Sequence, residues 1–180
     1  KLALTGDIAR KPISAGIWNL IQLPHGGELI VPTYVRTEPR VLFGNIPADR
    51  LVSEDRALRL KMDFSGEHKI ALRAADLTGR AAYLRHSGGT WWLVIRNFSV
   101  NPSGEYVDVP KDAPNDLGYA FHAVNILGSL GAFCELEHHS PAFGRHETDA
   151  SVTDTSQVWA YCGPADAIKA IGKLLLGVEL

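Results

Sequence analysis

Apolar and polar residues alternate in short runs along most of this chain, and clusters of Gly, Pro, Asn and Asp separate the runs. Alternation with a period of two residues is typical of a half-buried β-strand. The pattern predicts ten strands, at Gly16–Leu23, Leu29–Thr33, Ala57–Asp63, Lys69–Ala74, Arg80–Arg85, Thr90–Phe98, Tyr106–Val109, Tyr119–Ile126, Ala132–His139 and Gln157–Tyr161. Short strands joined by turns make a sandwich or a barrel. We expect an all-β fold, an antiparallel β-sandwich.

Helical periodicity is confined to the end of the chain, where we predict one α-helix at about 164–176. We predict Gly163 as its cap, Pro164 as its first residue and Asp166 in its first turn, with Gly177 just past its end. One face carries an apolar stripe of Ile168, Ile171, Leu174 and Leu175. We expect this stripe to pack on the sheet, although it could instead face a partner.

Composition describes a single domain over residues 1–180, with 46% hydrophobic and 21% charged residues and no linker. The longest unbroken apolar run, Trp91–Ile95, is far shorter than the roughly 20 residues that cross a bilayer, so we expect no membrane partner. The net charge of −2 and the scattered basic residues argue against a nucleic-acid partner.

Cysteine usage adds little about the compartment. Cys134 and Cys162 are 28 positions apart and fit neither a zinc-finger spacing nor a disulfide framework. We expect two buried thiols, and whether they pair is open. The compartment stays open between the cytoplasm, which is slightly favoured, and secretion.

The densest chemical signal is the segment Phe133–Pro141. On a strand, Glu135, Glu137 and His139 share one face. If that face is solvated, it is the polar side of an exposed strand. If it lines a cleft, burial and like charge would raise the pKa of one carboxylate and suit it to acid–base chemistry.

A metal-dependent β-sandwich enzyme is a second interpretation of the same segment. Five possible metal ligands lie in or near it: His138, His139, His146, Glu147 and Asp149. The spacing supports this only weakly. Adjacent histidines on a strand point to opposite faces, so His138 and His139 cannot bind one ion without a bulge.

Other residues fit a site for a sugar, which needs an aromatic platform and polar groups that orient its hydroxyls. Trp18 and Gln22 share one face of the first long strand, and Arg96 interrupts an apolar strand. Core packing for the tryptophan and an ion pair for the arginine are the structural alternatives. Three further possible cleft residues are His122, Tyr106 and Asp108, and the histidine could equally be an interior imidazole.

Four phrases together resemble the galactose mutarotase-like superfamily, in particular its uncharacterised bacterial branches related to aldose 1-epimerases. The phrases are Ile17–Pro24, Leu29–Thr33, Tyr106–Asp108 and Phe133–Pro141. The similarity runs from about residue 16 to residue 176.

The resemblance implies a β-supersandwich that binds a small carbohydrate on a concave sheet face and uses no cofactor. It further implies a carboxylate base, Glu137 or Glu135, that takes the anomeric hydroxyl proton, and a histidine acid at the ring oxygen. His122 matches that acid by position only, because the catalytic histidine motifs of true epimerases are not recognisable. Without the acid, the protein would be a non-catalytic sugar-binding or interaction module.

The chain is shorter than the superfamily's full fold and looks like its C-terminal two-thirds. Missing opening strands would leave sheet edges uncovered, and exposed edges must be paired or protected. We therefore expect a homodimer that completes the sheet.

Overall fold

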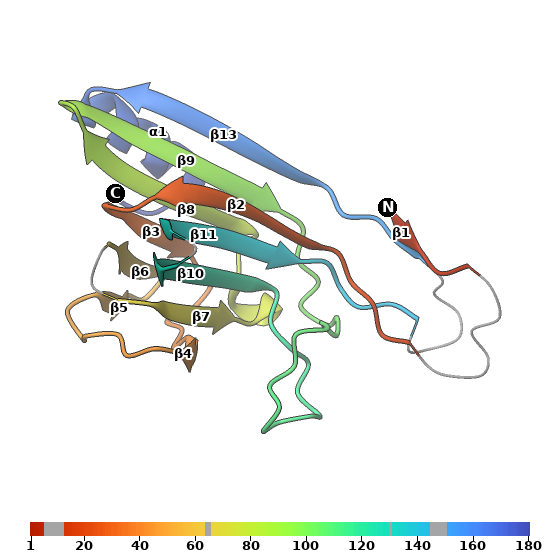
Figure 1. The fold of residues 1–180 in the computed structure, drawn as a ribbon. Coiled ribbons are helices and arrows are strands. Elements are labelled where there is room, and N and C mark those ends of the chain that lie inside the picture. The colour runs from red at the N-terminus through yellow and green to blue at the C-terminus, as the bar shows by residue number, and fades with distance from the viewer. Residues whose placement is uncertain (6–12, 64–65, 130, 145–150) are drawn as a thin grey trace.

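Two antiparallel sheets form the body of the computed structural model, which describes residues 1–5, 13–63, 66–129, 131–144 and 151–180 (Figure 1). The five-stranded sheet has the order β2 (Trp18–Pro24), β11 (Gly131–His139), β10 (Phe121–Gly128), β7 (His68–Leu72) and β4 (Arg40–Phe43). The six-stranded sheet has the order β13 (Ser156–Gly163), β9 (Thr90–Phe98), β8 (Arg80–Ser87), β3 (Gly27–Pro32), β6 (Ala57–Met62) and β5 (Leu51–Ser53). β1 (Leu2–Ala3) pairs with β12 (Ser151–Val152), and η1 (Ala74–Asp76) is a short 3-10 turn.

The core lies between the two large sheets and contains side chains from both. Cys134 and Leu136 of β11 point into it, as the alternation predicts, while Leu29 and Val31 enter from β3. Ile30, between these two, faces the other side of the six-stranded sheet. β3 is therefore apolar on both faces, because one face meets the core and the other meets the helix.

The helix α1 (Ala165–Leu176) covers the outer face of the six-stranded sheet. Pro164, in an extended conformation, is its N-cap, so the helix begins one residue later than predicted. Gly177, at φ +72°, ends it in the left-handed conformation that glycine tolerates best. Ile168, Ile171 and Leu175 pack on the sheet as predicted. Leu174 does not, and is 81% exposed, because six residues from Ile168 is about 240° around the helix axis.

The all-β sandwich with one C-terminal helix is thus confirmed, but some element predictions were wrong. Residues 106–109 form no strand, since the backbone N–H of Tyr106 bonds to Leu117 O at 2.7 Å in a loop. The edge strands β4 and β5 were missed because they are short and carry little alternation. Cys134 is buried as expected, whereas Cys162 is exposed, and the two thiols are unpaired. Within the described ranges, no helix has the length and apolar character that a membrane span requires.

Candidate functional site

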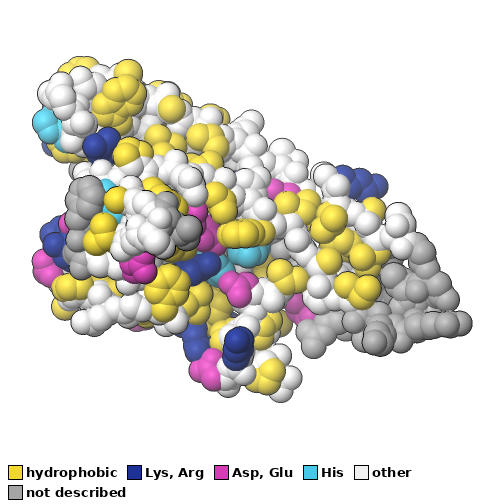
Figure 2. Space-filling model, in the orientation of Figure 1, with side chains coloured by type: hydrophobic (Ala, Val, Ile, Leu, Met, Phe, Trp, Pro, Cys, Tyr) yellow, Lys and Arg dark blue, Asp and Glu magenta, His cyan; other side chains and the backbone are white. Residues whose placement is uncertain are grey.

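Charged and histidine side chains gather on the outer face of the five-stranded sheet, the face turned away from the core. Antiparallel pairing sets His122 of β10 opposite Glu137 of β11, and His139 of β11 opposite Trp18 of β2. Such directly opposite residues have neighbouring side chains. We call six residues the outer-face cluster: Trp18, Lys69, Asp108, His122, Glu137 and His139. Figure 2 shows histidine, acidic and basic side chains adjoining one another near the centre of this view.

Glu137 is the buried centre of the outer-face cluster, with 1% of its surface exposed. Its Oε2 lies 3.1 Å from Lys69 Nζ and accepts a hydrogen bond of 3.1 Å from the Trp18 indole N–H. His122 Nδ1 is 3.4 Å from the same oxygen. Burial alone would raise the pKa of Glu137, but the contacts with His122 and Lys69 outweigh it and lower the pKa to about 2. The carboxylate is therefore held ionised, opposite to the raised pKa expected for a cleft acid.

His122 lies fully buried between two carboxylates. Its Nε2 is 3.1 Å from Asp108 Oδ2, and its Nδ1 faces Glu137. Both distances are those of ion pairs, but neither ring nitrogen meets the angular geometry of a hydrogen bond. A neutral imidazole has a single N–H, so it can satisfy one of these carboxylates and turns a lone pair toward the other.

His139 completes the outer-face cluster beside His122, with a ring-centroid distance of 4.8 Å. The Trp18 ring is nearly parallel to it at 6.4 Å. Burial, with a smaller effect of His122, lowers the pKa of His139 to about 4, so this imidazole is neutral near pH 7. Neither of its ring nitrogens has a hydrogen-bond partner among the described residues.

Glu135 and Gln22 lie on the same sheet face, beyond this cluster. The Gln22 amide donates a hydrogen bond of 3.0 Å to Glu135 Oε1, and both side chains are at least partly exposed. Of the two glutamates that the sequence left open, Glu137 is therefore the one in contact with His122.

Arg96 does not lie on this face, which corrects the prediction of a ligand contact. Even-numbered residues of β9 point toward the facing sheet, so its guanidinium is buried between the sheets with 1% exposure. Its Nε donates to His138 Nδ1 at 2.9 Å and its Nη1 to Leu136 O at 3.1 Å. It also donates to the Asn19 side-chain oxygen. Arg96 thus joins β9 to β11 and β2.

His138 belongs to the hydrogen-bond network of Arg96 between the two sheets, and its contacts leave no ring nitrogen for a metal ion. Because Arg96 has only donors, His138 Nδ1 must accept, and Nε2–H donates to Asp154 Oδ2 at 2.9 Å. Burial lowers the pKa of His138 even though Asp154 opposes the shift, consistent with this neutral form. Both ring nitrogens are occupied. The other suggested ligands, His146, Glu147 and Asp149, lie outside the described residues.

The loop before β10 contributes one of its two suggested cleft residues. Tyr106 is buried in the core, and its hydroxyl accepts a hydrogen bond of 3.0 Å from the Asn101 N–H, so it does not reach the outer face. Asp108 does reach it. Lys69 was missed as a site residue, because the pairing of β7 with β10 that places it on this face joins strands about 50 residues apart.

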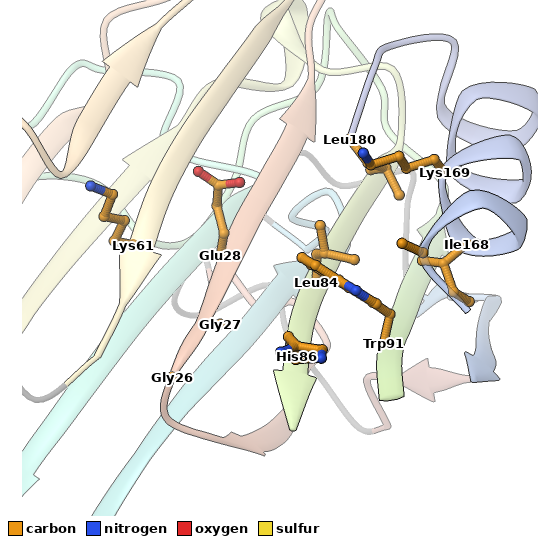
Figure 3. A pocket seen from close by; sticks show the side chains of 11 residues that line it. Gly26, Gly27, Glu28, Lys61, Leu84, His86, Trp91, Ile168, Lys169 and Leu180 are labelled. Atoms are coloured by element: carbon orange, nitrogen blue, oxygen red, sulfur yellow. The ribbon is translucent and has the colours of Figure 1, made fainter. Parts of the chain in front are cut away.

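A pocket of about 490 Å³ lies elsewhere, between α1 and the outer face of the six-stranded sheet (Figure 3). Apolar side chains of Leu84, Trp91 and Ile168 line it, with Glu28 and Lys61 at β3 and β6. It contains no residue of the outer-face cluster.

Comparison of the chain with models of protein families, with curated proteins and with solved structures finds no match.

Proposed function

We propose that this protein binds a small carbohydrate on the outer face of the five-stranded sheet, above the outer-face cluster. The observation that carries the proposal is Trp18, a residue that is 57% exposed while its indole N–H donates a hydrogen bond to Glu137. A pyranose has apolar C–H faces ringed by hydroxyls, so it suits a flat aromatic surface flanked by polar groups. Lys69 and Asp108 reach the surface beside it. The galactose mutarotase-like phrases support the same ligand class.

Saturation-transfer NMR with a panel of monosaccharides tests this proposal. We expect signals for at least one sugar at millimolar concentration and at least about a 10-fold weaker affinity after Trp18→Ala, because loss of roughly 1.4 kcal/mol of stacking is tenfold in Kd. Trp92→Ala is the matched control, since Trp92 is 48% exposed on the other sheet. If no sugar in the panel shows saturation transfer at about 10 mM, the proposal of carbohydrate binding is wrong.

Aldose epimerase-like catalysis is a second candidate, favoured by the contact between His122 and Glu137. Glu137 would accept the proton of the anomeric hydroxyl while the C1–O5 bond breaks, and a protonated His122 would give a proton to the ring oxygen. Reclosure on the other face reverses both transfers. A carboxylate with a pKa near 2 is a weak base, so we expect slow turnover.

Anomer exchange of hexoses, followed by NMR, tests catalysis separately from binding. We expect faster exchange with the wild type and with Glu135→Gln than with Glu137→Gln. If the wild type and Glu137→Gln both match the uncatalysed rate, the protein is a sugar-binding module without this activity.

A further inference from the structure

We propose that Asp108, His122 and His139 form a binding site for one divalent transition-metal ion of the Zn²⁺ type, a function beyond carbohydrate binding. Each residue offers one ligand atom, and the three atoms lie within 4.8 Å of one another. Small rotations of the side chains bring such atoms to the 2.0–2.2 Å metal–ligand distances of zinc sites.

The donor set selects the class of ion. Two imidazole nitrogens and one carboxylate oxygen suit Zn²⁺ and neighbouring first-row metals, whereas Ca²⁺ and Mg²⁺ prefer oxygen ligands alone. Three protein ligands leave a coordination position open, as in catalytic zinc sites. A water molecule or a hydroxyl of a bound ligand can take that position.

The two sides of His122 favour a cation over an empty site. In the neutral ring that has its single N–H on Nδ1, the side that faces Glu137, Nε2 has a lone pair and lies 3.1 Å from Asp108 Oδ2. Two acceptors at this distance repel each other, and a cation bound to both removes the repulsion. Glu137 would then be the carboxylate that orients the ligand histidine, an arrangement common around protein-bound metals.

His139 supplies an independent observation. It is more than nine-tenths buried, and both of its ring nitrogens lack a hydrogen-bond partner within the described part of the chain. A buried polar group without a hydrogen-bond partner is destabilising, and one explanation for such a group is that an ion binds to it. A metal ion would occupy one of these nitrogens.

Charge and access also fit a cation. Two carboxylates, Asp108 and Glu137, face one ammonium group, Lys69, so the surroundings of the two imidazoles have an excess negative charge. His122 and His139 lie on the central paired strands β10 and β11, which hold ligands rigidly. The Asp108 side chain is 43% exposed and gives the ion a route from solvent.

Metal titration of the chelator-treated chain is the test. We expect calorimetry to give one equivalent of Zn²⁺ with a micromolar or lower Kd, and Co²⁺ to give visible d–d absorption at the same stoichiometry. Asp108→Asn should weaken Zn²⁺ binding by at least about 100-fold, and Glu137→Gln by about 10- to 100-fold. His86→Asn, on an exposed residue of β8, is the control and should bind as the wild type.

Two results would overturn the proposal: no Zn²⁺ binding by the wild type at about 100 µM, or wild-type affinity in both Asp108→Asn and His139→Asn. If His139→Asn does not fold, Asp108→Asn decides alone, because its partly exposed side chain can be replaced without opening the core. Zn²⁺ titration without sugar and sugar titration in the presence of chelator measure the two bindings independently, so the metal site and carbohydrate binding stand or fall separately.

Discussion

His122 Nδ1 lies 3.4 Å from Glu137 Oε2, and the two residues are directly opposite each other on β10 and β11. Besides this contact with His122, Glu137 is the counter-ion of Lys69 and accepts a hydrogen bond from the Trp18 indole N–H. Loss of its charge leaves the partly buried Lys69 ammonium without its counter-ion.

Glu137→Gln should lower the free energy of unfolding by about 1–3 kcal/mol, because the amide keeps the shape but not the charge that Lys69 needs. Urea denaturation measures the difference. Glu135→Gln, on the same strand and partly exposed, should change stability by less than about 0.5 kcal/mol. Equal effects of the two substitutions would show that the Glu137 contacts contribute nothing.

Arg96→Met should destabilise the fold by about 3–5 kcal/mol. The substitution leaves His138 Nδ1, Leu136 O and the Asn19 oxygen buried without their donor. Arg36→Met is the control, because its ion pair with Glu38 is exposed and such pairs contribute little. A loss below about 1 kcal/mol for Arg96→Met would mean that water replaces the guanidinium.

Stability should fall in acid. His139 has a folded-state pKa of about 4, below its ordinary 6.5, so the unfolded chain binds the proton more readily and stability declines as pH falls from about 6.5 to 4. Glu137, with a pKa of about 2, contributes stability above pH 4.5 that is lost as pH falls toward 2. Each proton changes stability by at most about 1.4 kcal/mol per pH unit.

Denaturation between pH 7 and pH 4 in the presence of chelator measures the histidine effect. The pKa of His139 depends on the charges that surround it, which are those of His122, Asp108, Glu137 and Lys69. His139→Asn should flatten the profile from pH 6.5 to 4, whereas His86→Asn should leave it unchanged. An unchanged slope in His139→Asn would assign the acid sensitivity to other groups.

The two thiols should react at very different rates. Burial raises the pKa of Cys134 to about 11, whereas Cys162 is exposed on β13. In the reduced native protein, Ellman's reagent should label one thiol per chain quickly and the second only after unfolding. Cys162→Ser should abolish the fast reaction. Rapid labelling of both thiols would contradict the burial of Cys134.

The expected homodimer remains a proposal that the edge strands support. Among the described residues, β2 and β13 each pair with a single neighbour, and Val158 on β13 is half exposed. Sedimentation at about 10 µM should give twice the 19.6 kDa chain mass. Val158→Lys should shift the protein toward monomer, and Leu174→Lys on the helix should not. A monomeric wild type would disprove the prediction.

The sequence by itself determined which residues share a face, because alternation along a strand is a local property. It placed Glu135, Glu137 and His139 on the side opposite Cys134 and Leu136, and it located the helix from its end signals. Both were correct, since each depends on residues that lie close together in the chain.

Only the tertiary structure decided which faces meet. Lys69 contacts Glu137 across 68 positions, and Asp108 reaches His122 from a loop. Arg96 had a charge typical of a surface or ligand site, yet the facing sheet surrounds it with acceptors and buries it. Strand order and sheet stacking depend on pairings between distant segments, so the composition of the outer-face cluster followed from the folded chain and not from any local pattern.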